Sequence, residues 1–312
     1  MAVVFKFILL IAILYASSFA CDQRSPRRET AEWRDLFVGK CLLYKQVYGS
    51  RLLCNITIVC SQLWSKVKLA VEYQPKCNFN NSAYEDLVTA SQHFVPENKF
   101  LFWENVYPFV MWYSNSGHKY YTISDTLTGY LFDNIEWCGN STETDGIEKY
   151  PSTCPGYEVG PDCQKSAQSV FWETASKFYA RSAHGDVHVM LNASISPAFP
   201  KDSYFGNNEL PNINGSKVKK ATILMVHSLD DPVLETCSSE SIKNLMVRFT
   251  AKGISPSCID NPRDVQMLMC SENLSDPNCS ILRSSGAKRT MMTPLSYLIF
   301  LIFCFKSLNI FV

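Results

Sequence analysis

Carboxylates and tryptophans are the side chains of this sequence with the clearest potential for chemistry. Glu209 lies in the polar run SYFGNNELPNI, Trp103 ends the apolar run KFLFW, and Trp172 lies in SVFWETAS. A carboxylate can stabilise a developing positive charge or bond to it covalently, and an indole face attracts a cation. Structural alternatives are a solvated loop for Glu209 and core packing for the tryptophans. Asp125 and Asp133 add two acids, and helix capping is the alternative for Asp125.

Motifs of the common enzyme and nucleic-acid-binding classes are missing. The sequence has no glycine-rich dinucleotide fingerprint, P-loop, nucleophile elbow, zinc-protease helix or CxxC pair. His184 and His188 lie at the start of a predicted strand, too far apart to share a metal easily, and packing or surface exposure is their alternative. With 29 basic and 29 acidic side chains, the chain lacks the basic excess expected of a nucleic-acid partner. We therefore expect neither a metal site nor nucleic-acid binding.

Both ends of the chain resemble targeting segments that leave the mature protein. Residues 1–20 carry a Lys, a short apolar run and small residues before Cys21, which is typical of a cleaved signal peptide. Near the other end, small residues around Ser284 precede a polar spacer and the apolar run Leu295 to Phe305. This layout predicts a glycosylphosphatidylinositol anchor at Ser284 and removal of residues 285–312. An uncleaved anchor at one end and a transmembrane helix at the other are the alternatives, but both runs are short for a span.

Cysteines and sequons indicate an extracellular ectodomain over residues 21–284. Twelve of the 13 cysteines lie within it, and this even number predicts six disulfides in an oxidising compartment. Zinc ligation and free thiols are the alternatives. Glycosylation is predicted at seven Asn-X-Ser/Thr sequons. They are Asn55, Asn80, Asn140, Asn192, Asn214, Asn273 and Asn278.

Composition and periodicity favour a folded chain of the α+β or α/β class, with a mostly helical first half. At 46% hydrophobic and 19% charged residues, the chain is not disordered. Helical spacing occupies residues 36–95, 124–137, 167–183 and 238–252. Strands are predicted at residues 99–103, 186–191 and 221–227, and the continuous apolar character of the last two is typical of buried parallel strands. Cysteine-rich irregular segments are predicted at residues 138–165 and 255–283.

The predicted helix over residues 124–137 carries two of the candidate acids. It begins with Ser-Asp-Thr, a typical helix cap. Asp125 and Asp133 are eight residues apart, so they are expected on a similar face of this helix.

Four of these segments together resemble the ADP-ribosyl cyclase/NAD glycohydrolase family. SDTLTGYLFDNIEWCG, SVFWETAS, DVHVMLNAS and YFGNNELPN recur there in the same order, and the likeness covers about residues 36–280. It implies a helical subdomain and a small parallel-sheet α/β subdomain, stapled by disulfides, with the active-site cleft between them. The helical part would comprise residues 22–96 and 122–183, and the α/β part residues 97–121 and 184–283.

The resemblance also implies a disulfide pattern. It gives Cys41–Cys60, Cys77–Cys163, Cys138–Cys154, Cys237–Cys258 and Cys270–Cys279. A sixth family disulfide would need cysteines near Glu97 and His184, and this chain has neither. Cys21 and Cys54 are then unassigned, and we predict that they pair with each other.

The family chemistry implied by the resemblance is cleavage of NAD at the nicotinamide–ribose bond. Nicotinamide leaves as a neutral molecule, so the reaction needs no added cofactor, no metal and no general acid for its departure. Glu209 would be the catalytic carboxylate. Substrate binding would involve Trp103, Trp172, Ser176, Asp133, Asp125, Ser124, Tyr204 and Phe205.

This chain departs from the family at three places, at or next to these residues. Ser124 stands where the family has Glu, a position that influences how the intermediate divides between water and ring closure. Glu104-Asn105 replaces Ser-Arg, so phosphate contacts must come partly from elsewhere. Tyr204 replaces a smaller residue before Phe205 and is expected to narrow the cleft.

Two functions of different classes follow from these residues. The first is an NAD glycohydrolase at the extracellular face of the plasma membrane, anchored by lipid in the outer leaflet, with cyclisation and base exchange as minor reactions. The second is a surface binding protein that has kept the fold and lost catalysis. Glu209, Trp103 and Trp172 favour the first, because a fold kept only for binding could lose all three. A single transmembrane span or secretion are the alternatives to lipid anchoring.

Overall fold

The chain forms two compact units. The computed structural model describes residues 30–53, 57–115, 119–143, 146–148, 151–157, 160–272 and 274–279. Unit 1 runs to His93 and resumes over Leu127–Ala175. Unit 2 comprises Phe94–Thr126 and the chain from Ser176 onward.

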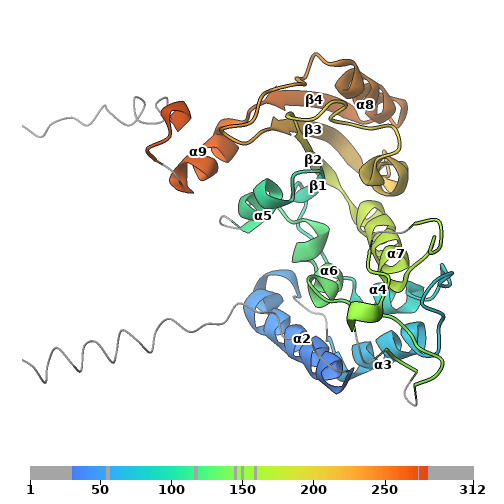
Figure 1. Ribbon diagram of the computed structural model, residues 1–312. Coiled ribbons are helices and arrows are strands. Elements are labelled where there is room, and N and C mark those ends of the chain that lie inside the picture. The colour runs from blue at the N-terminus through green and yellow to red at the C-terminus, as the bar shows by residue number, and fades with distance from the viewer. Residues whose placement is uncertain are drawn as a thin grey trace, which may run out of the picture. The chain divides into compact units, whose positions relative to one another are not determined.

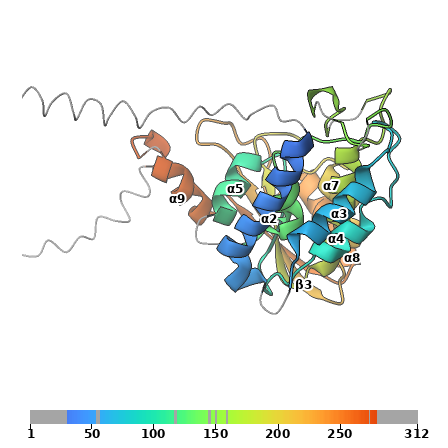
Figure 2. The ribbon, with the colours of Figure 1, turned by 90° about the horizontal axis from the view of Figure 1, so that it is seen from below.

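Unit 1 is helical. Its helices are α2 (Thr30–Leu52), α3 (Cys60–Val71), α4 (Glu85–Ser91), α6 (Leu127–Phe132) and the first part of α7 (Ala167–Ser182). α2 packs against α3 and α6, and α4 contacts both α3 and α6. Figure 2 shows α3 beside α2 and α4. A short 3-10 turn, Pro151–Thr153, interrupts the otherwise irregular segment before α7.

Aromatic side chains fill the interior of unit 1. Phe132 lies 4.0 Å from Phe171 and 4.7 Å from Trp137, ring centre to ring centre. The indole N–H of Trp137 donates to the Tyr84 hydroxyl at 2.8 Å, and the Tyr84 ring has no exposed surface. Rings of this size supply much of the buried apolar area of a small core, and the hydrogen bond satisfies both buried polar atoms.

The disulfides follow the predicted pattern. Unit 1 contains Cys41–Cys60, Cys77–Cys163 and Cys138–Cys154, and unit 2 contains Cys237–Cys258 and Cys270–Cys279. Five predicted pairings are therefore confirmed. The sixth, Cys21–Cys54, lies outside the described residues.

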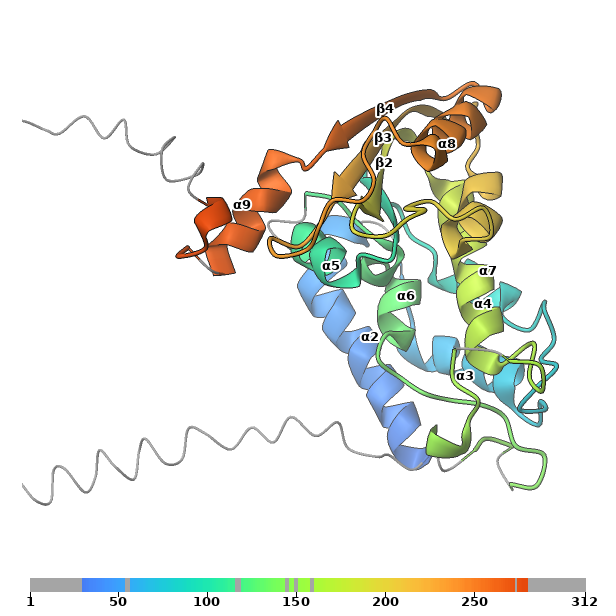
Figure 3. The same cartoon turned by 45° about the horizontal axis from the view of Figure 1, so that its top comes forward.

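Unit 2 is built on a four-stranded sheet in which every neighbouring pair of strands is parallel (Figures 1 and 3). The strands lie in the order β1 (Phe100–Glu104), β2 (Gly185–Asn192), β3 (Val218–Val226) and β4 (Ser255–Asp260). The accompanying helices are α5 (Tyr107–Asn115), α8 (Glu240–Ala251), α9 (Arg263–Glu272) and the last part of α7. Short turns are η1 (Ile123–Asp125), η3 (Phe205–Glu209), η4 (Leu210–Asn212) and η5 (Pro277–Cys279).

Alternation along the strands divides the apolar side chains between two faces of the sheet. One face packs against α5 and α9. Its cluster contains Leu101, Met190 and Leu224 from the sheet, Val110 from α5 and Val265 and Met269 from α9. On the other face, Phe100 and Phe102 of β1 pack against Tyr179 of α7, and Phe102 also contacts Phe205. This second face therefore carries the turn that ends in Glu209.

The prediction of one continuous helix over residues 124–137 is wrong, because the structure has two separate elements, η1 and α6, in this region. Thr122, not Ser124, caps the short turn η1, and Thr126 is extended with ψ 156°. α6 begins afresh at Leu127, whose N–H donates to His93 Nε2 at 2.9 Å. Asp125 therefore lies in η1 and Asp133 just beyond α6, so the two acids do not share a helix face.

Two other expectations also need correction. The segment 255–283 contains β4 and α9 rather than irregular chain, and β4 lacked an apolar signal because it is a largely exposed edge strand. Residues 122–126 and 176–183 belong to unit 2, not to the helical part. The last part of α7 belongs to unit 2 because Tyr179 packs there. Its hydroxyl donates to Tyr121 O at 2.5 Å, and its ring packs against Phe100 of β1.

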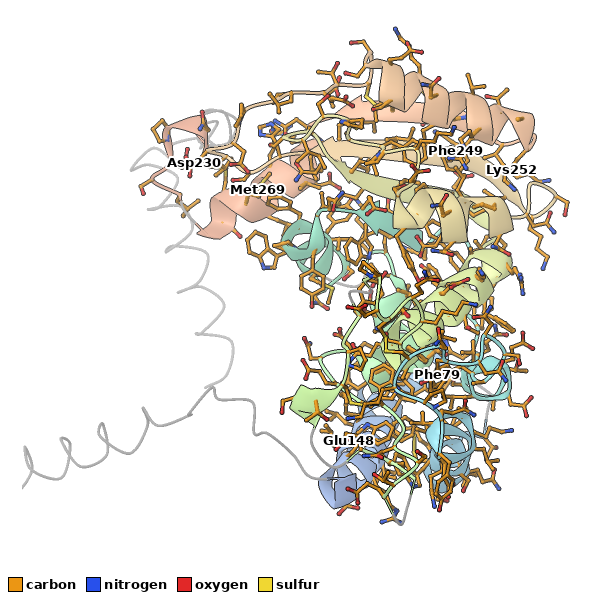
Figure 4. The ribbon with its side chains drawn as sticks, turned by 45° about the vertical axis from the view of Figure 1, so that its right-hand side comes forward. Phe79, Glu148, Asp230, Phe249, Lys252 and Met269 are labelled. Atoms are coloured by element: carbon orange, nitrogen blue, oxygen red, sulfur yellow. A yellow bond between two sulfur atoms is a disulfide. The ribbon has the colours of Figure 1, made fainter. Side chains whose placement is uncertain are left out.

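The segment after Glu209 is fixed to the end of α8. Lys252, labelled there in Figure 4, donates to Pro211 O at 2.9 Å and Ile213 O at 3.2 Å. Gly215 lies so close that a Cβ there would meet Lys252 O at 1.8 Å. Only glycine permits this approach of two backbones.

We therefore expect Gly215→Ala to destabilise the protein by about 1–3 kcal/mol, because the added methyl group must push two backbone segments apart. Differential scanning calorimetry should show a lower unfolding temperature. The matched control is Gly39→Ala on the exposed side of α2, where a Cβ meets nothing within 4 Å. It should be neutral or stabilising, and equal effects of the two changes would contradict this packing.

Candidate functional site

Glu209 is a buried carboxyl at the end of a single π-helical turn. It is only 6% exposed, so a solvated loop position is excluded. Arg248 of α8 donates to Gly206 O at 2.9 Å, and the Gly206 N–H donates to Ser203 Oγ at 2.9 Å. These contacts hold η3 from both sides. A Cβ on Gly206 would meet Ser203 Oγ at 2.8 Å, so the tight turn favours glycine there.

The surroundings of Glu209 favour its protonated form in the empty protein. Burial first, and then the nearby Glu104 carboxyl, raise the pKa of Glu209 to about 8, and a hydrogen bond from Ser176 opposes both effects. Ser176 is itself buried and lies on α7, one turn after Trp172. A positive charge brought next to Glu209 would favour ionisation instead.

Glu104, at the carboxyl end of β1, is the second acid of this group. Its Oε2 accepts the Phe205 N–H at 2.9 Å, and its carboxyl also accepts the Tyr204 N–H. Burial raises the pKa of Glu104, and these two backbone N–H groups lower it. Glu104 therefore places an acid at the start of η3. From the sequence, the replacement of Ser-Arg by Glu104-Asn105 indicates only the loss of a phosphate contact.

Tyr179 and Asp125 complete the polar surroundings of Glu209. The pKa of the fully buried Tyr179 is raised well above its ordinary value, by burial first, and both Asp125 and Glu209 contribute to the rise. Asp125 forms a capping box: its carboxylate accepts the Thr122 N–H and hydroxyl, each at 2.7 Å. The capping alternative for Asp125 is therefore realised, and its neighbour Ser124 is half-buried.

Trp103 leaves β1 on the side opposite to Glu104, because successive residues of a strand alternate between faces. Its ring packs against the cluster under α5 and lies 5.8 Å from the Tyr107 ring, and the side chain is half-buried. In η3, Phe205 is fully buried against Phe102, whereas Tyr204 is half-buried. Phe205 thus anchors the turn to β1 through its contact with Phe102.

The two remaining candidates lie in unit 1. Lys40 Nζ donates to Asp133 O at 2.6 Å and lies over the Tyr130 ring. Burial raises the pKa of Asp133, and the Lys40 charge and the Asn134 N–H oppose that rise. Trp172 is half-buried on α7, with its ring 5.1 Å from Phe171.

Among the described residues, no three His, Cys, Asp or Glu side chains group as a metal site. No helix in this part of the chain has the length and apolar character needed to cross a bilayer. Of the predicted modification sites, Asn80, Asn214 and Asn278 are exposed and Asn140 and Asn192 half-buried. Asn55, Asn273 and Ser284 lie outside the described residues.

Comparison with known proteins confirms the class that this fold and these residues define. A family model described as ADP-ribosyl cyclase matches residues 30–279. The chain belongs to the ADP-ribosyl cyclase family, a family of enzymes.

Relatives match over most of their length. The ADP-ribosyl cyclase/cyclic ADP-ribose hydrolase of Aplysia californica is 34% identical over 256 residues, covering 81% of this chain and 88% of the relative. Human ADP-ribosyl cyclase/cyclic ADP-ribose hydrolase 2 is 31% identical over 269 residues, covering 86% and 81%.

Solved structures show the same fold. Aplysia cyclase complexed with substrate NGD and product cGDPR matches with a TM-score of 0.73 and 34% identity, covering 81% of this chain and 98% of that one. Porcine CD38 complexed with a covalent intermediate matches with a TM-score of 0.68 and 28% identity, covering 76% and 99%.

The raised pKa of Glu209 predicts that stability declines as the pH rises. The folded chain keeps this proton up to a pKa of about 8, whereas an unfolded glutamic acid releases it near pH ~4.3. Folding therefore takes up a proton between these values, and the free energy of unfolding falls across the interval. Wild type should lose stability relative to Glu209→Gln from about pH 5 to pH 8, measured by thermal unfolding.

Glu97→Gln, at an exposed position of the same unit, is the matched control and should parallel wild type. A constant stability difference between wild type and Glu209→Gln over the interval would contradict a carboxyl that is protonated on folding.

Proposed function

We propose that this protein cleaves the nicotinamide–ribose bond of NAD and transfers the ADP-ribosyl group mainly to water. The observation that carries the proposal is the buried Glu209 carboxyl on η3, in a chain that belongs to the ADP-ribosyl cyclase family. The names of its relatives, which combine ADP-ribosyl cyclase and cyclic ADP-ribose hydrolase, support the same ribose anomeric carbon as the reacting centre.

The chemistry needs one carboxylate at the reacting carbon. In NAD the nicotinamide nitrogen is cationic, so the ring departs as a neutral molecule without a proton donor. The ribose anomeric carbon then develops oxocarbenium character, which Glu209 stabilises or captures covalently. No cofactor and no metal take part in this proposal, since NAD is the substrate.

Glu209 must be ionised to act in this chemistry, and the positive charge of the substrate favours that ionisation. Burial and Glu104 keep Glu209 protonated in the empty protein up to about pH 8. The pyridinium charge of bound NAD lowers the pKa of a neighbouring carboxyl, because opposite charges favour ionisation. The carboxylate then forms where a cation is present to be stabilised, and the Ser176 hydroxyl orients it.

Other residues keep the binding roles that the family resemblance gives them. By the resemblance, Trp103 and Trp172 are the indole faces for the cationic ring, and Asp133 matches a family acid for the nicotinamide amide. Asp125, Ser124, Tyr204 and Phe205 contribute to the substrate surroundings, Asp125 through the turn that it caps.

Capture of the intermediate decides the product. Water gives ADP-ribose, the substrate's own adenine nitrogen gives cyclic ADP-ribose, and a second pyridine gives base exchange. We propose hydrolysis as the main reaction because water is abundant and cyclisation needs the adenine folded back with water excluded. Ser124 in place of the family's acid makes this ratio the property to measure.

We further propose that the enzyme acts outside the cell. The predicted signal peptide, the sequons and the disulfides support export. The carboxy-terminal pattern supports a glycosylphosphatidylinositol anchor at Ser284 on the outer leaflet. Release of activity from intact cells by a phosphatidylinositol-specific phospholipase would support the anchor, and retention would favour a transmembrane span.

Product analysis of the full chain incubated with NAD tests the proposed function. We expect nicotinamide and mostly ADP-ribose by chromatography, with a small cyclic ADP-ribose peak. A dominant cyclic product would overturn hydrolysis as the main reaction. Absence of nicotinamide release from a folded, disulfide-bonded protein would overturn the enzyme proposal in favour of a binding protein.

Glu209→Gln should lower the rate of nicotinamide release by at least about 100-fold, because the amide keeps the size of the side chain but cannot balance the oxocarbenium charge. Glu97→Gln is the control for a change of net charge and should keep the wild-type rate. Circular dichroism and the unfolding temperature confirm that both variants fold. Activity of Glu209→Gln near the wild-type level would refute the mechanism.

A further inference from the structure

Glu104 is an acid in direct contact with the turn that presents Glu209. Its carboxylate accepts the N–H groups of Tyr204 and Phe205, the residues with which that turn begins. Charge-assisted hydrogen bonds of this kind fix backbone geometry more firmly than neutral ones. Glu104 is held by β1, so the turn is tied to the end of a rigid strand.

Glu104 is also an acid whose charge acts on Glu209. Among the described residues, neither the Glu104 nor the Glu209 carboxyl forms an ion pair with a basic side chain. Tyr179 and Ser176 face Glu209 from α7, and Asp125 acts on the same tyrosine from η1. Three basic side chains near this turn donate to carbonyl or amide oxygens and not to either carboxyl. Arg248 donates to Gly206 O, Lys252 to Pro211 O and Ile213 O, and Arg181 to Asn212 Oδ1.

We propose that Glu104 is a positioning residue for Glu209: its carboxylate holds the backbone of the turn that carries the catalytic carboxyl, and it places a negative charge near that carboxyl. This inference rests on the proposed NAD chemistry. Glu104 does not touch the reacting carbon in this account and acts only through η3 and through the field at Glu209.

Two carboxyl groups that act on each other share their protons unequally. Glu104 has two backbone N–H donors that favour its charge, whereas Glu209 has one hydroxyl. Glu104 therefore ionises first, and its charge holds the proton on Glu209. A substrate cation then competes with that proton, so the enzyme should work best on the alkaline side of neutrality.

The pH dependence of kcat/KM tests this role, since it reports ionisations of the free enzyme. Glu104→Gln keeps the acceptor oxygen for the turn and removes the charge. Its acid limb should lie at least about one pH unit below that of wild type. Glu104→Asp keeps the charge on a shorter side chain. It should lower kcat but keep the acid limb within about half a unit of wild type.

These readouts separate a tuning role from a merely structural one. A structural role would lower kcat in both variants without moving either acid limb. If Glu104→Gln does not fold, Glu104→Ser removes the same charge, leaves space for water at the two N–H groups and carries the same expectation. Glu97→Gln controls for net charge and should keep the wild-type profile.

An acid limb of Glu104→Gln within about 0.3 units of wild type, in a folded and active variant, would overturn the inference. That result would leave the proposed function intact, because wild type would still release nicotinamide. Failure of wild type to release nicotinamide at any pH would instead overturn the proposed function itself.

Discussion

Burial of one carboxyl group is the constraint on which this site depends. Removing a carboxylate from water is costly, so an isolated buried acid holds its proton. Glu209 is buried, one hydroxyl reaches it, and an acid rather than a base lies nearby. The same surroundings that disfavour its charge in the empty protein make a cation the natural partner for that charge. We expect selectivity for a cationic leaving group from this electrostatic preference.

The scaffold of unit 2 holds the carboxyl through three separate elements. β1 holds the backbone of the turn through Glu104, α7 contacts the Glu209 side chain through Ser176, and α8 holds the turn through Arg248. Lys252 at the end of α8 holds the segment that follows the turn. The Cys237–Cys258 disulfide in turn ties the segment before α8 to β4. Such redundancy suits a group whose reacting partner must be placed to within a fraction of an ångström.

Elements with strong local patterns could be predicted from the sequence. The apolar runs of β2 and β3 and the periodicity of α7 and α8 gave these elements within a few residues, and the family likeness gave five disulfides. β4 was missed because an exposed edge strand carries no apolar run. The helix expected over residues 124–137 was split because the backbone extends at Thr126, which periodicity does not reveal. The importance of Glu104 depends on contact with Phe205, 101 residues away. No local pattern could show it.

The central claim is that the Glu209 carboxyl, and not its neighbour, meets the anomeric carbon. Peptide mass spectrometry after reaction with an NAD analogue carrying fluorine at the 2′ position of the nicotinamide ribose tests it most directly. Such an analogue slows breakdown of a glycosyl–enzyme intermediate. We predict stoichiometric nicotinamide release and a ribosyl adduct on Glu209. Labelling of Glu104, or inactivation with no modified carboxylate, would contradict the account.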